Sequence, residues 1–320
     1  MLHRPWVAPL VVAFWCVTAG WLAGTKILPA FGAGEAPDGA AFLAGDDRLP
    51  PVGWSVLWNG SPIGWAINES SRDADGSITV RSRLHCDRLP LDEMLPGWAG
   101  TLVQRSLRRG ESTTLDATGR IAIDAAGRLG GFTSTVTLPG AGHRVTLEGV
   151  ARGDGTVAIS LRAGELRYDT TVRVPGRGMV GDELSPHAVL PGLYEGRRWT
   201  VPVYSPLRPG RAPLQILHAV AGGEETIFWG DRLVNARVVT YREDPSSPRE
   251  PRCRVWVDRS GRVLRHESAL LGAKMEFVRR TDADAARLAQ MAALVDAAAA
   301  DDKETAAGLD HAEPDEDLPP

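Results

Sequence analysis

Hydrophobic and polar residues alternate along most of the chain between residues 52 and 280. In the first such segment Trp54, Val56 and Trp58 share one parity, and the same period recurs in later segments. A period of two places alternate side chains on opposite faces of a strand, so it predicts half-buried β-strands. We expect strands at 52–58, 63–67, 77–85, 113–115, 120–124, 132–138, 144–150, 156–161, 166–174, 198–204, 214–221, 225–229, 233–241, 254–257, 263–268 and 274–279.

Short turns separate most of these segments. Asn59-Gly60 is a hairpin dipeptide, and Ser260-Gly261 marks a second tight turn. Strands joined by short turns pair antiparallel with their neighbours. We therefore expect a mainly β protein, a long antiparallel meander that forms a curved sheet or half-barrel. Proline-containing residues 175–191 break the pattern and are expected to cross between two halves, 52–174 and 190–280.

The longest apolar run lies at the N-terminus, from Trp6 to Ala30, and no charge occurs between Pro5 and Thr25. About 20 apolar residues cross a bilayer as a helix. The run predicts a transmembrane anchor within residues 1–30. Basic residues before it and acidic residues after it favour a cytoplasmic N-terminus. This indicates a single-pass inner (cytoplasmic) membrane protein whose C-terminal domain faces the periplasm or outside.

Two other interpretations of this run stay open. One is a cleaved signal peptide, because small residues occur around Pro29-Ala30 and Gly32-Ala33. The other is a cytoplasmic core helix. In each case Gly-, Ala- and Pro-rich residues 31–51 are expected to be a flexible linker.

The C-terminal part differs from the body of the chain. Thr281 is a helix-capping residue, and Leu288, Met291, Leu294 and Val295 predict one apolar face of an amphipathic helix over 282–300. Residues 301–320 hold eight acids and one lysine, a charge of −7, which leaves +3 of the total −4 for the rest. We expect this tail to be disordered. The nearly neutral body does not indicate a nucleic-acid partner.

Three cysteines occur, and Cys16 lies within the apolar run. Cys86 and Cys253 remain, each at the end of an expected strand. Outside the cytoplasm a disulfide can persist, so these two residues are a candidate disulfide. The alternative is two independent, partly buried thiols.

No motif predicts chemistry. His85 and Cys86 would point to opposite faces of a strand, so His85-Cys86-Asp87 does not form a catalytic trio. The glycines of residues 176–181 lack the strand–turn–helix setting of a dinucleotide site. The histidines lack metal-ligand spacing. We therefore assign no catalytic, cofactor or metal-binding residue, and no cofactor. The tryptophans outside the apolar run are expected to fill the core or to line an apolar pocket.

Several segments resemble a known type of bacterial domain. They are GSPIGWAINES, LPGLYEG, VAGGEETIFWGDRLVNARVV and CRVWVDRSGRVLRHESALLGAKMEFVRRTDADA. The last resembles uncharacterised membrane-anchored domains, notably planctomycete ones, that precede transglutaminase-like domains. The general pattern is similar to the DUF3108 and lipoprotein-carrier half-barrels. The resemblance implies a curved sheet with a helix against it, in the cell envelope. It carries no active-site residue, because its motifs are structural and the resemblance does not extend to the transglutaminase-like domain with its Cys, His and Asp.

These observations favour a non-catalytic binding or scaffolding module in the cell envelope. Its expected partners are the membrane, through the N-terminal helix, and another envelope protein such as a transglutaminase-like enzyme. Two alternatives stay open. One is a carrier or sensor that holds an apolar, lipid-like ligand on the concave sheet, and the other is an enzyme with a cleft assembled by the fold.

Overall fold

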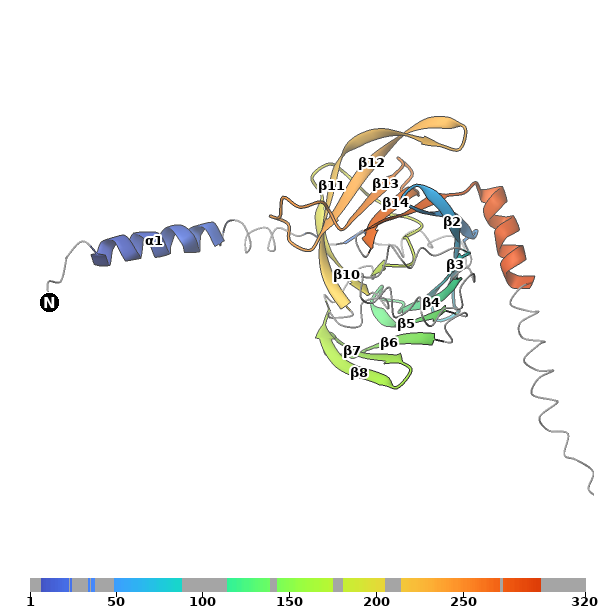
Figure 1. Ribbon diagram of the computed structural model, residues 1–320, viewed down its shortest axis with the longest axis horizontal. Helices are drawn as coiled ribbons and strands as arrows, with labels where there is room; N and C mark the ends of the chain where they lie inside the picture. The colour runs from blue at the N-terminus through green and yellow to red at the C-terminus, as the bar shows by residue number, and fades with distance from the viewer. Residues whose placement is uncertain are drawn as a thin grey trace, which may run out of the picture.

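Fifteen strands of the chain form a single sheet (Figure 1). The computed structural model describes residues 7–22, 24, 34, 36–37, 49–87, 114–138, 143–174, 181–204, 214–270 and 273–294. Its elements are α1 (Val7–Leu22), β1 (Val52–Trp58), β2 (Ser61–Arg72), β3 (Ile78–Cys86), β4 (Leu115–Ile123), β5 (Leu129–Leu138), β6 (His143–Ala151), β7 (Thr156–Ala163), β8 (Leu166–Arg173), β9 (Gly181–Asp182), β10 (Arg198–Tyr204), β11 (Leu214–Trp229), β12 (Arg232–Arg242), β13 (Cys253–Val257), β14 (Val263–Leu270) and β15 (Ala273–Arg279). A C-terminal helix covers residues 282–294.

The first strand lies in the middle of the sheet. The spatial order is β8-β7-β6-β5-β4-β3-β2-β1-β15-β14-β13-β12-β11-β10-β9. The chain therefore runs outward from β1 to β8, crosses to β9, and returns strand by strand to β15. The last strand then pairs antiparallel with the first, with Trp54 opposite Arg279. The two expected halves are thus parts of one sheet, joined by the β1–β15 ladder.

The expected mainly β meander is confirmed, and the hairpin turn has the expected geometry. Asn59 and Gly60 have φ of 48° and 84°, the positive values that a type I′ turn requires. Two pairs of expected strands are each one strand in the structure. Expected strands 113–115 and 120–124 both overlap β4, and 214–221 and 225–229 lie within β11. In β11 a register shift between Ala221 and Glu224 interrupts the alternation that the sequence pattern relies on.

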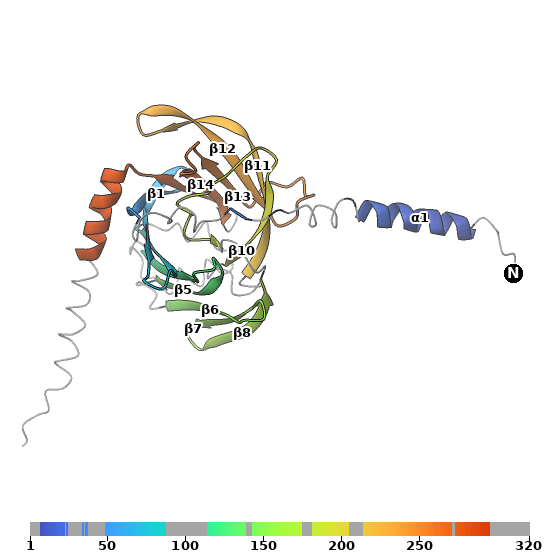
Figure 2. The same cartoon turned by 180° about the vertical axis from the view of Figure 1, so that it is seen from behind.

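The sheet curls around an interior but does not close by hydrogen bonds (Figures 1 and 2). Its edges are β8 and β9. Side chains join the two halves instead: the rings of Phe132 on β5 and Tyr204 on β10 stack at 4.2 Å with an interplanar angle of 4°. Both belong to a buried cluster that also contains Leu147, Leu161 and Leu214. Packing of apolar side chains therefore completes the curved body where strand pairing stops.

The crossing segment, residues 181–193, lies inside the curl. Leu184 and Leu190 are buried in the main hydrophobic cluster. Val189 forms a bridge with Arg262, and the Leu190 amide donates to Gly261 O at 2.8 Å. From the other half, the side-chain amide Nδ2 of Asn68 donates to Pro186 O at 2.8 Å. The segment thus fills the concave face and meets the backbone hydrogen-bonding needs of a buried loop.

Tryptophans contribute to the core on both sides of the β1–β15 ladder. Trp54, Trp58 and Trp199 are buried in the main cluster. Trp256 is also buried, but in a small separate cluster with Ala236 and Val238. Its indole N–H donates to Glu225 Oε2 at 2.9 Å. The core interpretation of these four tryptophans is therefore confirmed.

The N-terminal helix α1 is 16 residues long. Among the residues the structure describes, no helix is both long and apolar enough to cross a membrane. The transmembrane helix predicted within residues 1–30 is therefore not found at the length required, because the described helix ends at Leu22. Described positions of the expected 31–51 linker contact the sheet: Gly34 bridges Trp199, Ala36 joins the main cluster, and the Leu49 amide donates to Ser70 O at 3.3 Å. The linker prediction differs from the structure at these positions.

The C-terminal helix packs against the outer face of the sheet through Leu288, as expected, and through two alanines. Ala285, Leu288 and Ala292 are buried, whereas Met291 and Leu294 are 47% and 72% exposed. The expected apolar face is therefore wrong for Met291 and Leu294. The reason is a close approach at Gly53, where an added Cβ would lie 3.0 Å from Ala285 Cα. Residues 295–300 of the expected helix and the tail 301–320 lie outside the described residues.

We predict that Trp256→Ala lowers the free energy of unfolding by about 3 kcal/mol or more. The substitution removes a buried aromatic side chain and leaves Glu225 without its indole donor. Chemical denaturation measures this change. Phe228→Ala, at an aromatic residue that is 71% exposed, is the matched control and should change stability by less than about 0.5 kcal/mol. Equal effects of the two substitutions would contradict the placement of Trp256.

Candidate functional site

The candidate disulfide between Cys86 and Cys253 is not formed. Both thiols are free and buried. Cys86 lies on β3 and Cys253 on β13, and four strands separate β3 from β13 in the sheet. Each sulfur is packed within its own part of the main cluster. The expectation failed because a position at a strand end does not specify where that strand lies in the sheet.

Cys253 has a histidine neighbour that the sequence did not suggest. Its Sγ lies 3.4 Å from Nε2 of His266 on the adjacent strand β14. Burial raises the pKa of the Cys253 thiol well above its usual range. Burial and the nearby His187 lower the pKa of His266 to about 3. Both groups are therefore neutral near pH 7, so this pair does not supply the thiolate that a cysteine nucleophile requires.

A second buried polar pair joins the crossing segment to β10. Tyr204 donates its hydroxyl to Asp182 Oδ2 at 3.0 Å, and the Leu184 amide donates to Asp182 Oδ1 at 2.9 Å. Gly119 on β4 leaves room for this carboxyl, since an added Cβ there would lie 3.0 Å from Asp182 Oδ2. Burial raises the pKa of Asp182 to about 7, although both hydrogen bonds oppose the rise. The pair holds the crossing segment in place and is enclosed on all sides.

His85 lies on the opposite face of β3 from Cys86, as the alternation predicts. Its Nδ1 is 2.7 Å from Asp116 Oδ1, and its Nε2 is 2.9 Å from Asp87 Oδ1. Burial alone would lower the pKa of His85, but the hydrogen bonds and charges of the two aspartates outweigh burial and raise it. The ring also lies beside Trp65, at 5.6 Å between centroids. This cluster ties β2, β3 and β4 together on the outer surface.

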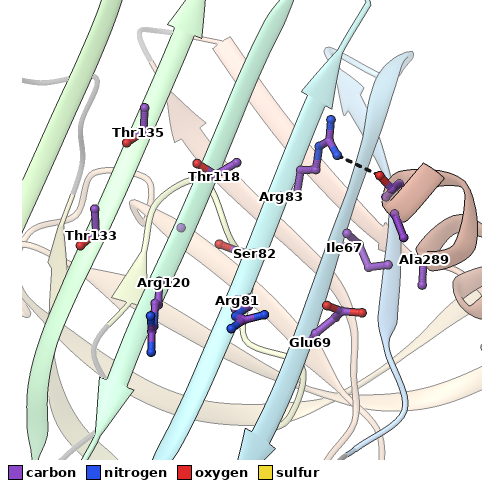
Figure 3. A pocket seen from close by; sticks show the side chains of 13 residues that line it. Ile67, Glu69, Arg81, Ser82, Arg83, Thr118, Arg120, Thr133, Thr135 and Ala289 are labelled. Atoms are coloured by element: carbon purple, nitrogen blue, oxygen red, sulfur yellow. Dashed lines mark hydrogen bonds between the residues drawn. The ribbon is translucent and has the colours of Figure 1, made fainter. Parts of the chain in front are cut away.

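The outer face of β2–β5 carries a groove beside the C-terminal helix (Figure 3). Its volume is about 480 Å³. Glu69, Arg81, Arg83 and Arg120 supply its charged side chains, and Ala289, Ala292 and Ala293 of the helix form one wall. The other lining residues are Ile67, Ser82, Thr118, Gly119, Thr133 and Thr135. We call this feature the outer groove.

The register of the sheet sets the charge pattern of the outer groove. Arg81 lies directly opposite Glu69 on β2 and directly opposite Arg120 on β4. Like charges at directly opposed positions destabilise a sheet. Among the described residues, neither Arg81 nor Arg120 has a carboxylate within ion-pair distance. Arg83 differs, because it donates to Ala292 O of the helix at 3.2 Å.

The outer face of the other half shows the contrasting arrangement. There Arg265 contacts Glu267 at 2.7 Å and Glu276 at 2.6 Å. Lys274 contacts the same two glutamates at 3.1 Å and 2.9 Å. Arg265 and Lys274 are thus neutralised within the chain, whereas Arg81 and Arg120 are available to a ligand. Among the described residues no group of three or more metal-ligating side chains is placed to hold a metal ion.

The sequence analysis did not single out the outer groove. Arg81 and Arg120 look like ordinary solvent-facing residues of two strands, and only the register of β3 against β4 makes them neighbours. The strands are joined by a long connection, residues 87–114, and the sequence pattern carries no register information across it. The alternation itself does place both side chains on the outer face.

Comparison with known proteins identifies no family. No protein-family model matches the chain, and no curated protein matches it. Among solved structures, the chain is similar to a β-barrel-like protein of DUF1849 from Brucella abortus, with 10% identity and a TM-score of 0.44 over 72% of this chain and 94% of the other. It is also similar to a DUF1089 family protein from Pseudomonas aeruginosa, with 14% identity and a TM-score of 0.31 over 65% and 91%. Similarities this low carry no functional argument.

We predict that Cys86 and Cys253 are inert in the folded protein. Burial raises the pKa of Cys86 to about 12, with the charges of Asp87 and Asp116 adding to the rise. In a Cys16→Ser background, thiol labelling at pH 7.5 should be on the order of 1,000-fold slower than for an unfolded cysteine, since only thiolate reacts. Denaturant should release both thiols. A melting temperature that falls on addition of dithiothreitol would show that a disulfide exists after all.

We predict that ionisation of Asp182 destabilises the folded protein as pH rises. Its pKa is about 7 in the folded protein and 3.8 in the unfolded chain, so the unfolded state loses its proton first. The contribution of protonated Asp182 to the free energy of unfolding is therefore fully present below about pH 4. It is lost as the pH rises to about 7, and the loss is on the order of 4 kcal/mol. Asp182→Asn should therefore gain stability relative to the native chain over this range. The difference between the two unfolding free energies, measured from pH 4 to 8, isolates Asp182 from the buried histidines, and parallel curves would contradict the prediction.

Proposed function

We propose that this chain is a non-catalytic binding or scaffolding module of the cell envelope whose outer groove holds an acidic segment of a protein partner. The observation that carries the proposal is the Arg81–Arg120 pair, two directly opposed cations without an ion-pair partner in the described chain. A carboxylate ligand would relieve their mutual repulsion. It would also give each guanidinium the planar, two-oxygen acceptor that it binds best.

The rest of the outer groove suits an extended peptide. Its lining residues come from β2 to β5, four adjacent strands. With strands about 4.8 Å apart, this width is roughly 14 Å, the length of about four extended residues. The hydroxyls of Thr118, Thr133 and Thr135 lie along the same face and can donate or accept hydrogen bonds. Glu69 lies at the β2 side of the groove and repels acidic residues of a ligand at that side. A peptide with acidic residues near one end is therefore expected to bind in one orientation, with that end at the arginines.

The membrane tether belongs to the same proposal. The described side chains of α1 that are large and apolar are exposed around the helix, among them Leu10, Phe14, Trp15 and Trp21. A helix that is apolar on all sides is typical of an apolar environment rather than of water. We propose that α1 and its apolar flanks anchor the module in the inner membrane, with the sheet on the outer side. The partner would be another envelope protein, and a transglutaminase-like enzyme is the class that the sequence resemblance suggests.

The alternative of a lipid carrier on the concave sheet has less support. The concave face is covered by the crossing segment, and Leu184 and Leu190 occupy its centre. Trp54, Trp58 and Trp199 fill the same cluster instead of lining an open cavity. This buried and hydrogen-bonded crossing segment would have to move out of the interior before a lipid could bind there. The outer groove is therefore the better candidate binding surface.

We predict that an Arg81→Gln, Arg120→Gln double variant binds a fluorescent oligo-glutamate peptide at least ten-fold more weakly than its parent. The loss follows from removal of two charge-assisted contacts. Fluorescence anisotropy in a non-ionic detergent measures it. In both proteins the eight acids of residues 301–320 are changed to Asn or Gln, so that the chain contributes no competing charge.

An Arg173→Gln, Arg254→Gln double variant is the control, because it removes the same charge from exposed outer positions of β8 and β13. It should bind the peptide nearly as well as the parent. If both double variants lose affinity equally, the binding is a general charge effect and the proposal fails.

A further inference from the structure

We infer that the chain's own acidic tail, residues 301–320, occupies the outer groove and regulates access to it. This inference rests on the proposed function, since it assumes that the outer groove binds acidic segments. It makes the tail an intramolecular competitor that a partner must displace. The argument comes from the position of the helix, the reach of the chain and the distribution of charge.

The helix that precedes the tail forms a wall of the outer groove. Ala289, Ala292 and Ala293 line it, and Arg83 bonds to Ala292 O near the end of the described helix. Figure 3 shows Arg83 directed at the helix, with Arg81 on the same strand and Arg120 on the adjacent strand. The helix is fixed to the sheet by the close approach of Ala285 to Gly53. The chain therefore leaves the sheet beside the outer groove.

The tail can reach the two arginines. The last described helical residue is Leu294, and the first acid of the tail is Asp301. Seven residues span at most about 25 Å when extended and about 10 Å when helical. The outer groove is roughly 14 Å across, from the strand spacing. An extended segment of this length is longer than the groove is wide, and a helical one is only a few ångströms shorter. In either conformation the first acids of the tail can reach the groove or come within a few residues of reaching it.

Charge favours this occupant. The tail has eight acids and one lysine, and seven of the acids lie in two groups, Asp301–Glu304 and Glu313–Asp317. The groove has three arginines against one glutamate, and Arg81 and Arg120 have no ion-pair partner among the described residues. The rest of the chain carries a net charge of only +3. The densest negative segment and the unpaired positive pair are thus connected by a short stretch of chain.

Tethering makes a weak contact effective. A short flexible connection gives an effective concentration on the order of 1 mM. If the free tail sequence binds the groove with a Kd of about 100 μM, the tethered tail occupies it about nine-tenths of the time. An external acidic ligand then binds about ten-fold more weakly than to an open groove. A partner with several correctly placed acids would still displace the tail.

The first test compares two full-length proteins in the same detergent. One has the native tail, and the other has its eight acids changed to Asn or Gln. The fluorescent oligo-glutamate peptide should bind the neutral-tail protein about ten-fold more tightly than the native protein. Arg81→Gln with Arg120→Gln should abolish this difference, because both proteins then lack the site.

The outcomes separate the two proposals. Equal and measurable binding to native and neutral-tail proteins would overturn occupation by the tail and leave the acidic-partner proposal standing. Absence of binding to both would overturn both proposals. Tighter binding to the neutral-tail protein that persists in the double arginine variant would show a general charge effect and would overturn tail occupation of this groove.

Cross-linking gives an independent test of position. Cys86 and Cys253 are buried and are therefore not expected to form cross-links in the folded protein. In a Cys16→Ser background, Thr133→Cys in the groove with Ala312→Cys in the tail should form an intramolecular disulfide at least several-fold faster than Thr171→Cys with Ala312→Cys. Thr171 is an exposed position on β8, outside the groove. Equal rates, or cross-links only between two chains, would overturn the intramolecular assignment.

Discussion

The ladder between β1 and β15 is the interaction on which the rest of the structure depends. It pairs the first strand of the sheet with the last, with Trp54 opposite Arg279 and Val56 opposite Phe277. Because the chain starts in the middle of the sheet, both halves grow outward from this ladder and curl toward each other. The stacked rings of Phe132 on β5 and Tyr204 on β10 then join the two halves a second time. A local meander is thus completed by two long-range contacts, one of backbone hydrogen bonds and one of side chains.

The interior and the outer face have different roles because of how the crossing segment is placed. It enters the curl with its own polar partners, Asp182 with Tyr204 and Asn68 with Pro186 O. This placement fills the space that a half-barrel carrier would keep for a ligand. It leaves the outer face as the surface with unpaired charge. The Cys253–His266 pair shows the same principle, since burial keeps both groups neutral and inert.

The outer groove depends on a helix that packs through small side chains. Gly53 and Ala285 let the helix approach the sheet closely, and Ala292 accepts the Arg83 hydrogen bond. A helix held by Met291 and Leu294 would turn a different face to the sheet and would build a different wall. The same packing places the end of the described helix at the groove that also contains Arg81 and Arg120, where the acidic tail is proposed to bind. The anchor, the sheet and the tail would then act together as a tethered module with a self-occupied binding surface.

The alternation of side chains and the turn residues at Asn59-Gly60 and Ser260-Gly261 determined the strands, their antiparallel pairing and the outward direction of Arg81, Arg120 and His85. These properties are local, since each depends on residues within one hairpin. The tertiary structure alone decided the β1–β15 pairing, the separation of Cys86 from Cys253, the buried face of the C-terminal helix and the opposition of Arg81 to Arg120. Each of these depends on the register between segments joined by long connections, and a period of two along one strand contains no information about its partner across such a connection.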